Sequence, residues 1–178
     1  MPALPASDYI KVIAPPPVVL ISTLFGEVNN LAPYGMVMPV SFDPPLMAFG
    51  FRQERDTYRN IMDTKEFVVA YPTPEVAEAV DKTAQALPRD QSEFALAGLT
   101  PQPSRAVRSA SVAECPVNIE CRLEWAKQAG DHHVVVGRAV AVSVSEELSA
   151  AGLSRSALQP IYHLSAPGHA YARLGAPI

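Results

Sequence analysis

The residues best suited to chemistry lie in a short segment at positions 55–61, RDTYRNI. It supplies a guanidinium at Arg55, a hydroxyl at Thr57 and an amide at Asn60. The segment also opens a helix expected over residues 57–64, and N–H groups in a first helical turn attract anions because they lack intrahelical partners. It therefore predicts a phosphate-binding site, whereas two arginines considered alone would more often form a solvated helix face.

A second segment could lie against a flat ligand. It runs through Asn30, Leu31, Ala32, Pro33, Tyr34 and Gly35. Small residues and a proline allow the backbone to approach a ligand closely while it stays extended. The alternative is an ordinary turn in which Asn and Gly take their usual positions.

A third segment, at residues 130–138, places an imidazole at the start of a strand. His132 follows Gly130 and Asp131, and a valine-rich strand follows it. A lone histidine in a β turn is more often structural or exposed than catalytic. Its value as a candidate depends on the other two segments lying nearby.

Other chemistries lack support in the sequence. The serines have no G-x-S-x-G setting, and the histidines form no H-E-x-x-H pattern. Cys115 and Cys121 are expected on one face of one strand, about 20 Å apart, which is too far for a disulfide. Without ligands at zinc spacing, no metal is expected, and the cysteines are interpreted as buried thiols.

Composition favours a soluble globular protein. The 178 residues suit a single domain over residues 1–178, with 48% hydrophobic and 18% charged residues. A net charge of −4 gives no basis for nucleic-acid binding. No apolar run approaches the ~20 residues of a membrane helix, and the N-terminus lacks signal-peptide features, so a cytoplasmic location without membrane contact is expected.

The elements that must position these segments are mostly strands. In the first half we expect strands at residues 18–21, 29–32, 46–51 and 67–71, and helices at 57–64, 73–87 and 90–98. Asp56 is the expected N-cap of the first helix, and Asp90 with Glu93 has the form of a capping box. Gly98 is expected to close the third helix.

The second half predicts a long antiparallel hairpin. Residues 117–125 alternate, which places Val117, Ile119, Cys121, Leu123 and Trp125 inward and Glu120, Arg122 and Glu124 toward water. Residues 133–144 form the returning strand, and 148–178 are too irregular to assign. No βαβ unit or Gly-rich Rossmann junction is present. The chain is therefore expected to be mainly β with short helices, as a barrel or sandwich.

The order of the motifs resembles the flavin reductase-like FMN-binding split-barrel family, with the flavoredoxin-like branch most similar. The resemblance rests on the segments at residues 17–23 (PVVLIST), 30–35 (NLAPYG), 41–45 (SFDPP), 55–61, 93–100 (EFALAGLT), 130–132 (GDH) and 171–175 (YARLG). Their combined order and spacing, from about residue 12 to 175, is more specific than any single motif.

The resemblance implies a six-stranded antiparallel Greek-key split β-barrel that forms a homodimer with non-covalent FMN near the subunit interface. Thr23 and the backbone of residues 30–35 would lie along the flavin ring and ribityl chain. Arg55 and Thr57 would hold the phosphate, with Asn60 supporting the helix start. His132 would lie on the nicotinamide side, although some relatives' spacing selects His133.

Two positions depart from the pattern of the family. Gly35 stands where many relatives carry serine, and Pro16 replaces a basic residue.

The implied function is an NAD(P)H:flavin oxidoreductase that serves a monooxygenase or another electron acceptor. Two alternatives are an FMN-containing electron carrier without direct NAD(P)H oxidation and a barrel that has lost its cofactor, against which Arg55 and Thr57 argue.

Overall fold

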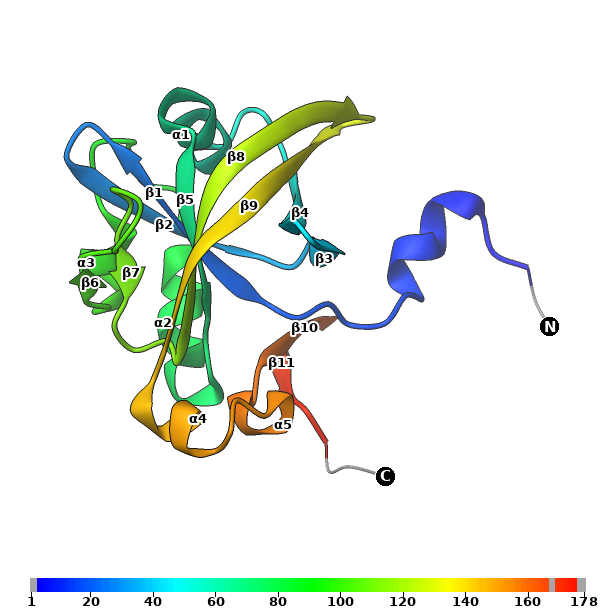
Figure 1. The fold of residues 1–178 in the computed structure, drawn as a ribbon. Coiled ribbons are helices and arrows are strands. Elements are labelled where there is room, and N and C mark those ends of the chain that lie inside the picture. Colours follow the sequence, from blue (N-terminus) through cyan, green and yellow to red (C-terminus); the bar gives the residue numbers. More distant parts are fainter. Residues whose placement is uncertain (1–2, 167–168, 176–178) are drawn as a thin grey trace.

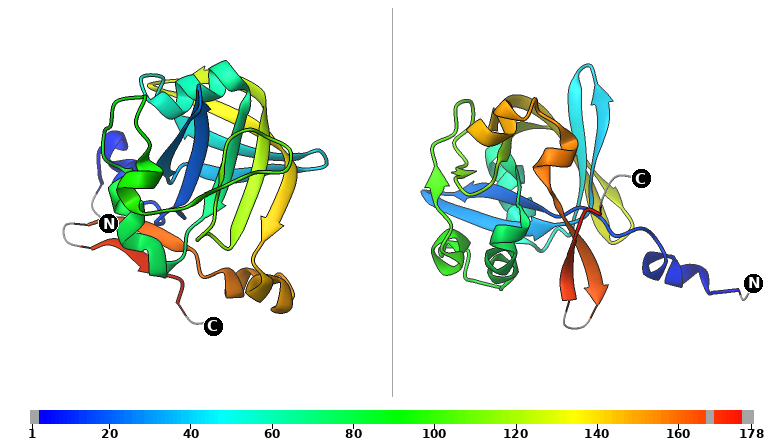
Figure 2. Two further views of the ribbon diagram at one scale, coloured as in Figure 1. Left: turned by 90° about the vertical axis from the view of Figure 1, so that its left-hand side faces the viewer. Right: turned by 90° about the horizontal axis from the view of Figure 1, so that it is seen from below.

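The computed structural model describes residues 3–166 and 169–175, and its centre is a curved antiparallel sheet of seven strands (Figures 1 and 2). The order across the sheet is β2-β1-β5-β8-β9-β4-β3. The strands are β1 (Val19–Phe25), β2 (Val28–Tyr34), β3 (Val37–Phe42), β4 (Pro45–Phe51), β5 (Glu66–Tyr71), β8 (Val117–Ala129) and β9 (His132–Val144). The mainly β, antiparallel prediction is confirmed, and β2 and β3 remain as open edges of the sheet.

The strand count differs from the expected six because β3 was not anticipated. Pro39 lies within this strand, and proline cannot donate to a strand ladder. The structure accommodates it on an edge strand, beside a register shift between Pro39 and Ser41 in the β3–β4 pairing. The Greek-key arrangement itself stays a prediction.

Short helices and small sheets surround the main sheet. The helices are η1 (Ala6–Lys11), α1 (Asp56–Thr64), η2 (Pro74–Val76), α2 (Ala77–Thr83), α3 (Glu93–Ala97), α4 (Glu146–Ala150) and α5 (Arg155–Leu158). The small sheets pair β6 (Pro101–Gln102) with β7 (Ser111–Val112), and β10 (Ile161–Ala166) with β11 (His169–Arg173). Within the described ranges no helix is long and apolar enough to cross a membrane.

The expected helices form, with different boundaries. Arg55, not Asp56, occupies the N-cap of α1. The helix expected over 73–87 is a 3-10 turn followed by α2, which ends at Thr83. There the Thr83 hydroxyl donates to the Val80 carbonyl at 2.8 Å, a local bond that competes with the helical ladder. Gly98 closes α3 in the left-handed region, as predicted.

Two apolar clusters bury opposite sides of the central strands. In β1, Val19 and Ile21 join a cluster that includes Ile61 of α1. Leu20 joins the other cluster, which includes Val80 of α2 and residues of α3. Because helices cover both faces, this strand is apolar at successive positions, without the alternation of a half-exposed strand.

The inward and outward assignment for β8 is partly wrong. Glu120, expected in water, is 1% exposed, whereas Trp125, expected inside, is 47% exposed. Register shifts between Glu120 and Cys121 and between Leu123 and Trp125 interrupt the β8–β9 pairing, and such bulges break strict alternation. The Glu120 carboxylate accepts hydrogen bonds from the backbone N–H groups of residues 105–107.

Both cysteines are buried free thiols, as predicted, but they do not share a strand face. Cys115 precedes β8 and belongs to the cluster with α2, while Cys121 lies in the cluster with α1. Burial raises the pKa of each thiol to about 12. Neither is therefore a thiolate nucleophile near neutral pH.

The N-terminal arm, which includes η1, extends away from the sheet (Figures 1 and 2). None of the η1 residues is buried, and Tyr9 and Ile10 are exposed. The arm then returns toward the sheet, where the Val18 N–H donates to the Ile161 carbonyl at 2.9 Å.

Candidate functional site

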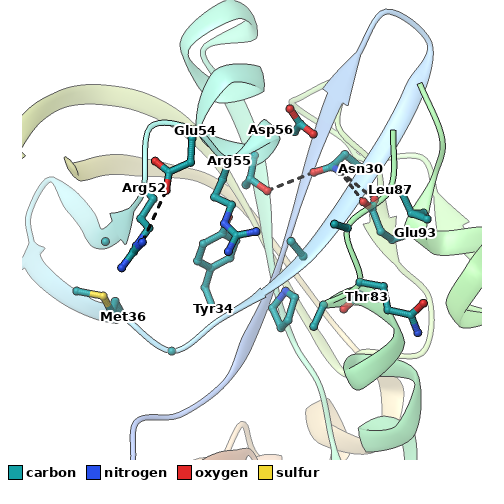
Figure 3. Close-up of a pocket in the computed structure, with 18 of the residues that line it drawn as sticks. Asn30, Tyr34, Met36, Arg52, Glu54, Arg55, Asp56, Thr83, Leu87 and Glu93 are labelled. Atoms are coloured by element: carbon teal, nitrogen blue, oxygen red, sulfur yellow. Dashed lines mark hydrogen bonds and ion pairs between the residues drawn. The ribbon is translucent and has the colours of Figure 1, made fainter. Parts of the chain in front are cut away.

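A pocket of about 560 Å³ lies where β2 ends and α1 begins (Figure 3). Its walls come from the end of β2, the loop into α1, the segment 83–87 after α2, and the start of β9. The pocket brings together most of the predicted site residues, namely Asn30, Ala32, Pro33, Tyr34, Gly35, Arg55, Thr57 and His132. Thr23, Leu31 and Asn60 do not line it and are fully buried behind its wall.

One end of the pocket is suited to an anion. Arg55 is exposed and forms no ion pair with any described residue, whereas Arg59 pairs with Asp56 at 3.3 Å. The first turn of α1 has no side-chain cap, so its N–H groups are available to a ligand. A free guanidinium beside an uncapped helix start is a favourable site for a phosphate group, although the Asp56 carboxylate in the same turn partly opposes it.

Tyr34 forms an aromatic wall beside Arg55 (Figure 3). Its ring packs edge-on against Phe51, with centroids 4.6 Å apart. Burial raises the pKa of Tyr34 to about 12, while a hydrogen bond with Thr57 and the charge of Arg55 act in the opposite direction. Tyr34 is therefore a neutral phenol and offers a flat, partly apolar surface.

A chain of buried polar side chains supports the pocket from behind. The Asn30 carboxamide oxygen accepts from the hydroxyls of Thr23 at 3.3 Å and Thr57 at 3.2 Å. The Asn60 amide donates to the Thr23 hydroxyl at 3.0 Å. Thr23 and Asn60 thus fix Asn30 and the start of α1, and Thr23, which was expected along the ligand, lies behind Asn30 and does not line the pocket.

Glu93, interpreted in the sequence as part of a capping box, instead lies in the pocket wall. The N-cap of α3 is Ser92, which makes no side-chain cap bond. Glu93 as a residue is 5% exposed, and its carboxylate accepts from Asn30 Nδ2 at 2.9 and 3.0 Å and from the Leu31 backbone N–H at 2.9 Å. Desolvation raises the pKa of Glu93, these hydrogen bonds lower it, and the nearby charge of Asp56 raises it further.

The raised pKa of Glu93 predicts a pH-dependent stability. The folded chain holds this proton more tightly than the unfolded chain, so the contribution of Glu93 is fullest below the ordinary glutamate pKa. It is lost as the pH rises through the raised value. Denaturant unfolding of wild type and Glu93→Gln between about pH 4 and about pH 8 checks this. The unfolding free energy of the wild type should fall relative to that of Glu93→Gln as the pH rises. A difference that stays constant with pH would contradict the assignment.

The opposite wall is the segment 83–87, which begins at the last residue of α2 and is irregular from residue 84 onward, and which the sequence did not indicate as part of a site. Side chains just beyond it tie the chain to the sheet and to α1. Arg89 donates to Asn60 Oδ1 at 2.6 and 2.9 Å and to Asp63 at 2.8 Å. The Ser92 hydroxyl donates to the Asn29 carbonyl at 2.5 Å. These bonds hold the wall in place without regular secondary structure.

The two adjacent histidines occupy different surroundings. His132 lines the pocket, and its Nδ1 lies 2.8 Å from Asp131 Oδ1. This contact lowers the pKa of Asp131. His133 packs against the Tyr58 ring with centroids 4.8 Å apart and is not among the residues that line the pocket. Of the described residues, no group of three or more His, Cys, Asp or Glu could hold a metal ion.

Gly35 and Pro16, the two departures from the family pattern, contact each other. A Cβ added to Gly35 would lie 3.0 Å from Pro16 Cγ and 3.5 Å from Pro16 Cβ. A serine at position 35 would therefore crowd the proline ring. The two departures are therefore sterically complementary, and Pro16 of the N-terminal arm lies close to this end of the pocket.

Comparison with known proteins agrees with this architecture. The family model described as "Flavin reductase like domain" matches residues 13–162. An uncharacterized protein of Aquifex aeolicus is 32% identical over 145 residues, which cover 78% of this chain and 74% of that protein. The structure of nitrilotriacetate monooxygenase component B from Bacillus cereus is 32% identical, with a TM-score of 0.87 over 98% of this chain and 94% of that one.

A flavoredoxin from Desulfovibrio vulgaris shares the fold, with a TM-score of 0.81 at 24% identity over 93% of this chain and 90% of that one. The family match spans well over half of the sequence and includes β1 to β9, from which the pocket is built. The chain therefore belongs to the flavin reductase-like family.

Proposed function

We propose that this protein binds FMN non-covalently, as a single domain over residues 1–178, and works as an NAD(P)H:flavin oxidoreductase. The observation that carries the proposal is Arg55, which forms no ion pair with any described residue, at the uncapped start of α1 next to the flat wall formed by Tyr34 and the end of β2. The pocket volume of about 560 Å³ also lies within the ~300–1,000 Å³ range of small-molecule sites.

The residues present fit FMN. Arg55 and the N–H groups of the first turn of α1 would hold the phosphate, with the Thr57 hydroxyl beside them. The backbone of residues 32–35 would lie along the ring system. Bound flavin would supply hydride acceptance and onward electron transfer, so the protein's part is to bind, orient and exclude water.

His132 is proposed to orient the nicotinamide side of the reaction. Its position at the start of β9 puts an imidazole on the pocket wall, and Asp131 fixes the ring through Nδ1. Asp131 also lies 3.5 Å from Arg52, so the turn is tied to the loop that leads into α1. Because Nδ1 faces Asp131, Nε2 is the ring nitrogen proposed to contact the ligand.

Replacing His132 with alanine should slow flavin reduction by NADH or NADPH about 10- to 100-fold while FMN stays bound. Stopped-flow bleaching of the flavin measures the rate, and the absorbance of desalted protein measures retention. His133→Ala is the matched control, because His133 packs on Tyr58, and it should leave the rate unchanged. Loss of FMN from His132→Ala would refute the orienting role.

An absorbance experiment separates the reductase from the electron carrier. The protein is incubated with FMN, desalted, and given NADH or NADPH without oxygen. Retained flavin that bleaches quickly supports the reductase. Retained flavin that stays oxidised favours a carrier that receives electrons from a partner protein. Absence of retained flavin, together with no NAD(P)H oxidation in excess free FMN, would refute both.

The partner is proposed to be a monooxygenase or another electron acceptor, supported by the likeness to a monooxygenase component B.

A cytoplasmic homodimer is part of the same proposal. Exposed apolar side chains on β3 support it, since Phe42 is 88% exposed and Met38 is also exposed. Light scattering on wild type and Met38→Asp would check the dimer, with a shift toward monomer expected in the variant.

A further inference from the structure

Glu93 is a buried carboxylate that meets only hydrogen-bond donors. Among the described residues its recorded partners are the Asn30 side-chain amide and the Leu31 backbone N–H. Figure 3 shows Glu93 beside Asn30, across the pocket from Arg55. Such contacts favour the ionised form, which accepts but does not donate, and so act against the desolvation that raises the pKa of Glu93.

The Leu31 contact involves the free edge of the sheet. β2 is an edge strand, so its outward N–H groups have no neighbouring strand to accept them. Glu93 satisfies the N–H of Leu31, and the preceding Ser92 donates to the carbonyl of Asn29. The start of α3 therefore covers the β2 edge just before the strand enters the pocket.

We infer that Glu93 is a positioning residue of the flavin site: its carboxylate fixes the Asn30–Leu31 part of β2 and places a negative charge in the pocket wall. Only the part of this inference that concerns the flavin rests on the proposed function. Through Asn30, whose oxygen accepts from Thr57, the Glu93 side chain connects α3 to the start of α1. The phosphate end and the ring wall are thus aligned by one side chain that is 62 residues from Leu31 in sequence.

Glutamine cannot reproduce these contacts. It keeps one acceptor oxygen but replaces the other with an NH₂ group, which would face the N–H donors of Asn30 or Leu31. A buried donor without an acceptor is costly, so β2 should loosen locally. The substitution also removes the negative charge from the wall of the pocket.

Glu120 offers a matched control. It is also a buried glutamate that accepts backbone N–H groups, from residues 105–107, yet it does not line the pocket. Glu120→Gln should lower the stability of the fold without changing β2 or the flavin. A general effect of losing a buried carboxylate is thereby separated from an effect specific to position 93.

The first measurement needs no flavin. Amide hydrogen exchange at Leu31 should be about 10-fold faster in Glu93→Gln than in wild type, and unchanged in Glu120→Gln. If Glu93→Gln does not fold, Glu93→Asp keeps the charge but withdraws it by one methylene, and it should show the same faster exchange. Unchanged exchange at Leu31 in a folded position-93 variant would overturn the inference, whatever the flavin does.

The second measurement uses the flavin complex. Glu93→Gln should weaken FMN and riboflavin by a similar factor, about 10-fold, because Glu93 contacts β2 directly and reaches the start of α1 only through Asn30. It should also raise the reduction potential of the bound flavin, because a nearby negative charge disfavours added electrons. Unaltered affinity and potential would overturn the flavin part. Faster Leu31 exchange in a protein that binds no flavin would support the positioning of β2 and refute the proposed function alone.

Discussion

Replacing Arg55 with alanine should weaken FMN binding by about 10- to 100-fold and leave riboflavin binding nearly unchanged. Riboflavin lacks the phosphate, and Arg55 is the cation at the uncapped start of α1 that forms no ion pair with any described residue. A charge-assisted contact with phosphate is stronger than a neutral hydrogen bond, so the loss should be specific to the phosphorylated ligand. Titration of flavin fluorescence with both ligands measures the difference.

Arg59→Ala is the control for this prediction. Arg59 lies on the same helix and is also exposed, but its guanidinium pairs with Asp56 at 3.3 Å. Its removal should change FMN affinity by less than about threefold, as expected for an exposed ion pair. Equal weakening of FMN and riboflavin by Arg55→Ala would show that Arg55 does not contact the phosphate.

Replacing Gly137 with alanine should destabilise the fold by about 1–3 kcal/mol, the usual cost of overpacking a core. Gly137 lies on β9, and an added Cβ would lie 2.9 Å from Phe67 Cε1, with Cζ still closer, and 3.3 Å from Cys121 Cβ. Phe67 is fully buried and packs edge-on against Phe49, so it has little room to move. Thermal unfolding should show a midpoint lower by about 2–4 °C per kcal/mol for a chain of this size.

A second substitution tests the cause. Phe67→Leu shortens the side chain that meets the new methyl group, so Gly137→Ala should cost less in that background than in the wild type. A double-mutant cycle gives the coupling energy, expected at about 0.5–3 kcal/mol for residues in contact. Additive effects of the two substitutions would contradict the steric explanation.

The sequence predicted those elements whose pattern is local. The β8–β9 hairpin follows from alternation and a glycine turn, and α1 follows from its polar start and apolar face. Glu120 and Trp125 were assigned to the wrong sides because bulges shift the alternation, and a bulge has no local signature here. The edge strand β3 was missed because Pro39 argues against a strand unless its position at the edge is already known.

The site was predictable where ligand-binding chemistry is local and unpredictable where it depends on distant contacts. Arg55 and Thr57 share one helix start, and β2 brings Tyr34 beside them. Glu93 reaches Asn30 only in the folded chain, and its neighbourhood in sequence resembles a capping box. The segment 83–87 was predicted as the end of a helix, but α2 ends at Thr83, so only the fold places the residues after it in the pocket wall.

The way segment 83–87 is held has a consequence for how a flavin bound in this pocket would leave. α2 holds it at one end, and Arg89, Ser92 and Glu93 hold the other, so a swing of the whole wall would break several hydrogen bonds at once. The residues between these anchors carry no regular secondary structure and are the part that can yield first. The lifetime of the complex would then be set by a local opening at residues 85–87. Shortening or stiffening this stretch would slow the release of the ligand without changing any residue proposed to bind the phosphate.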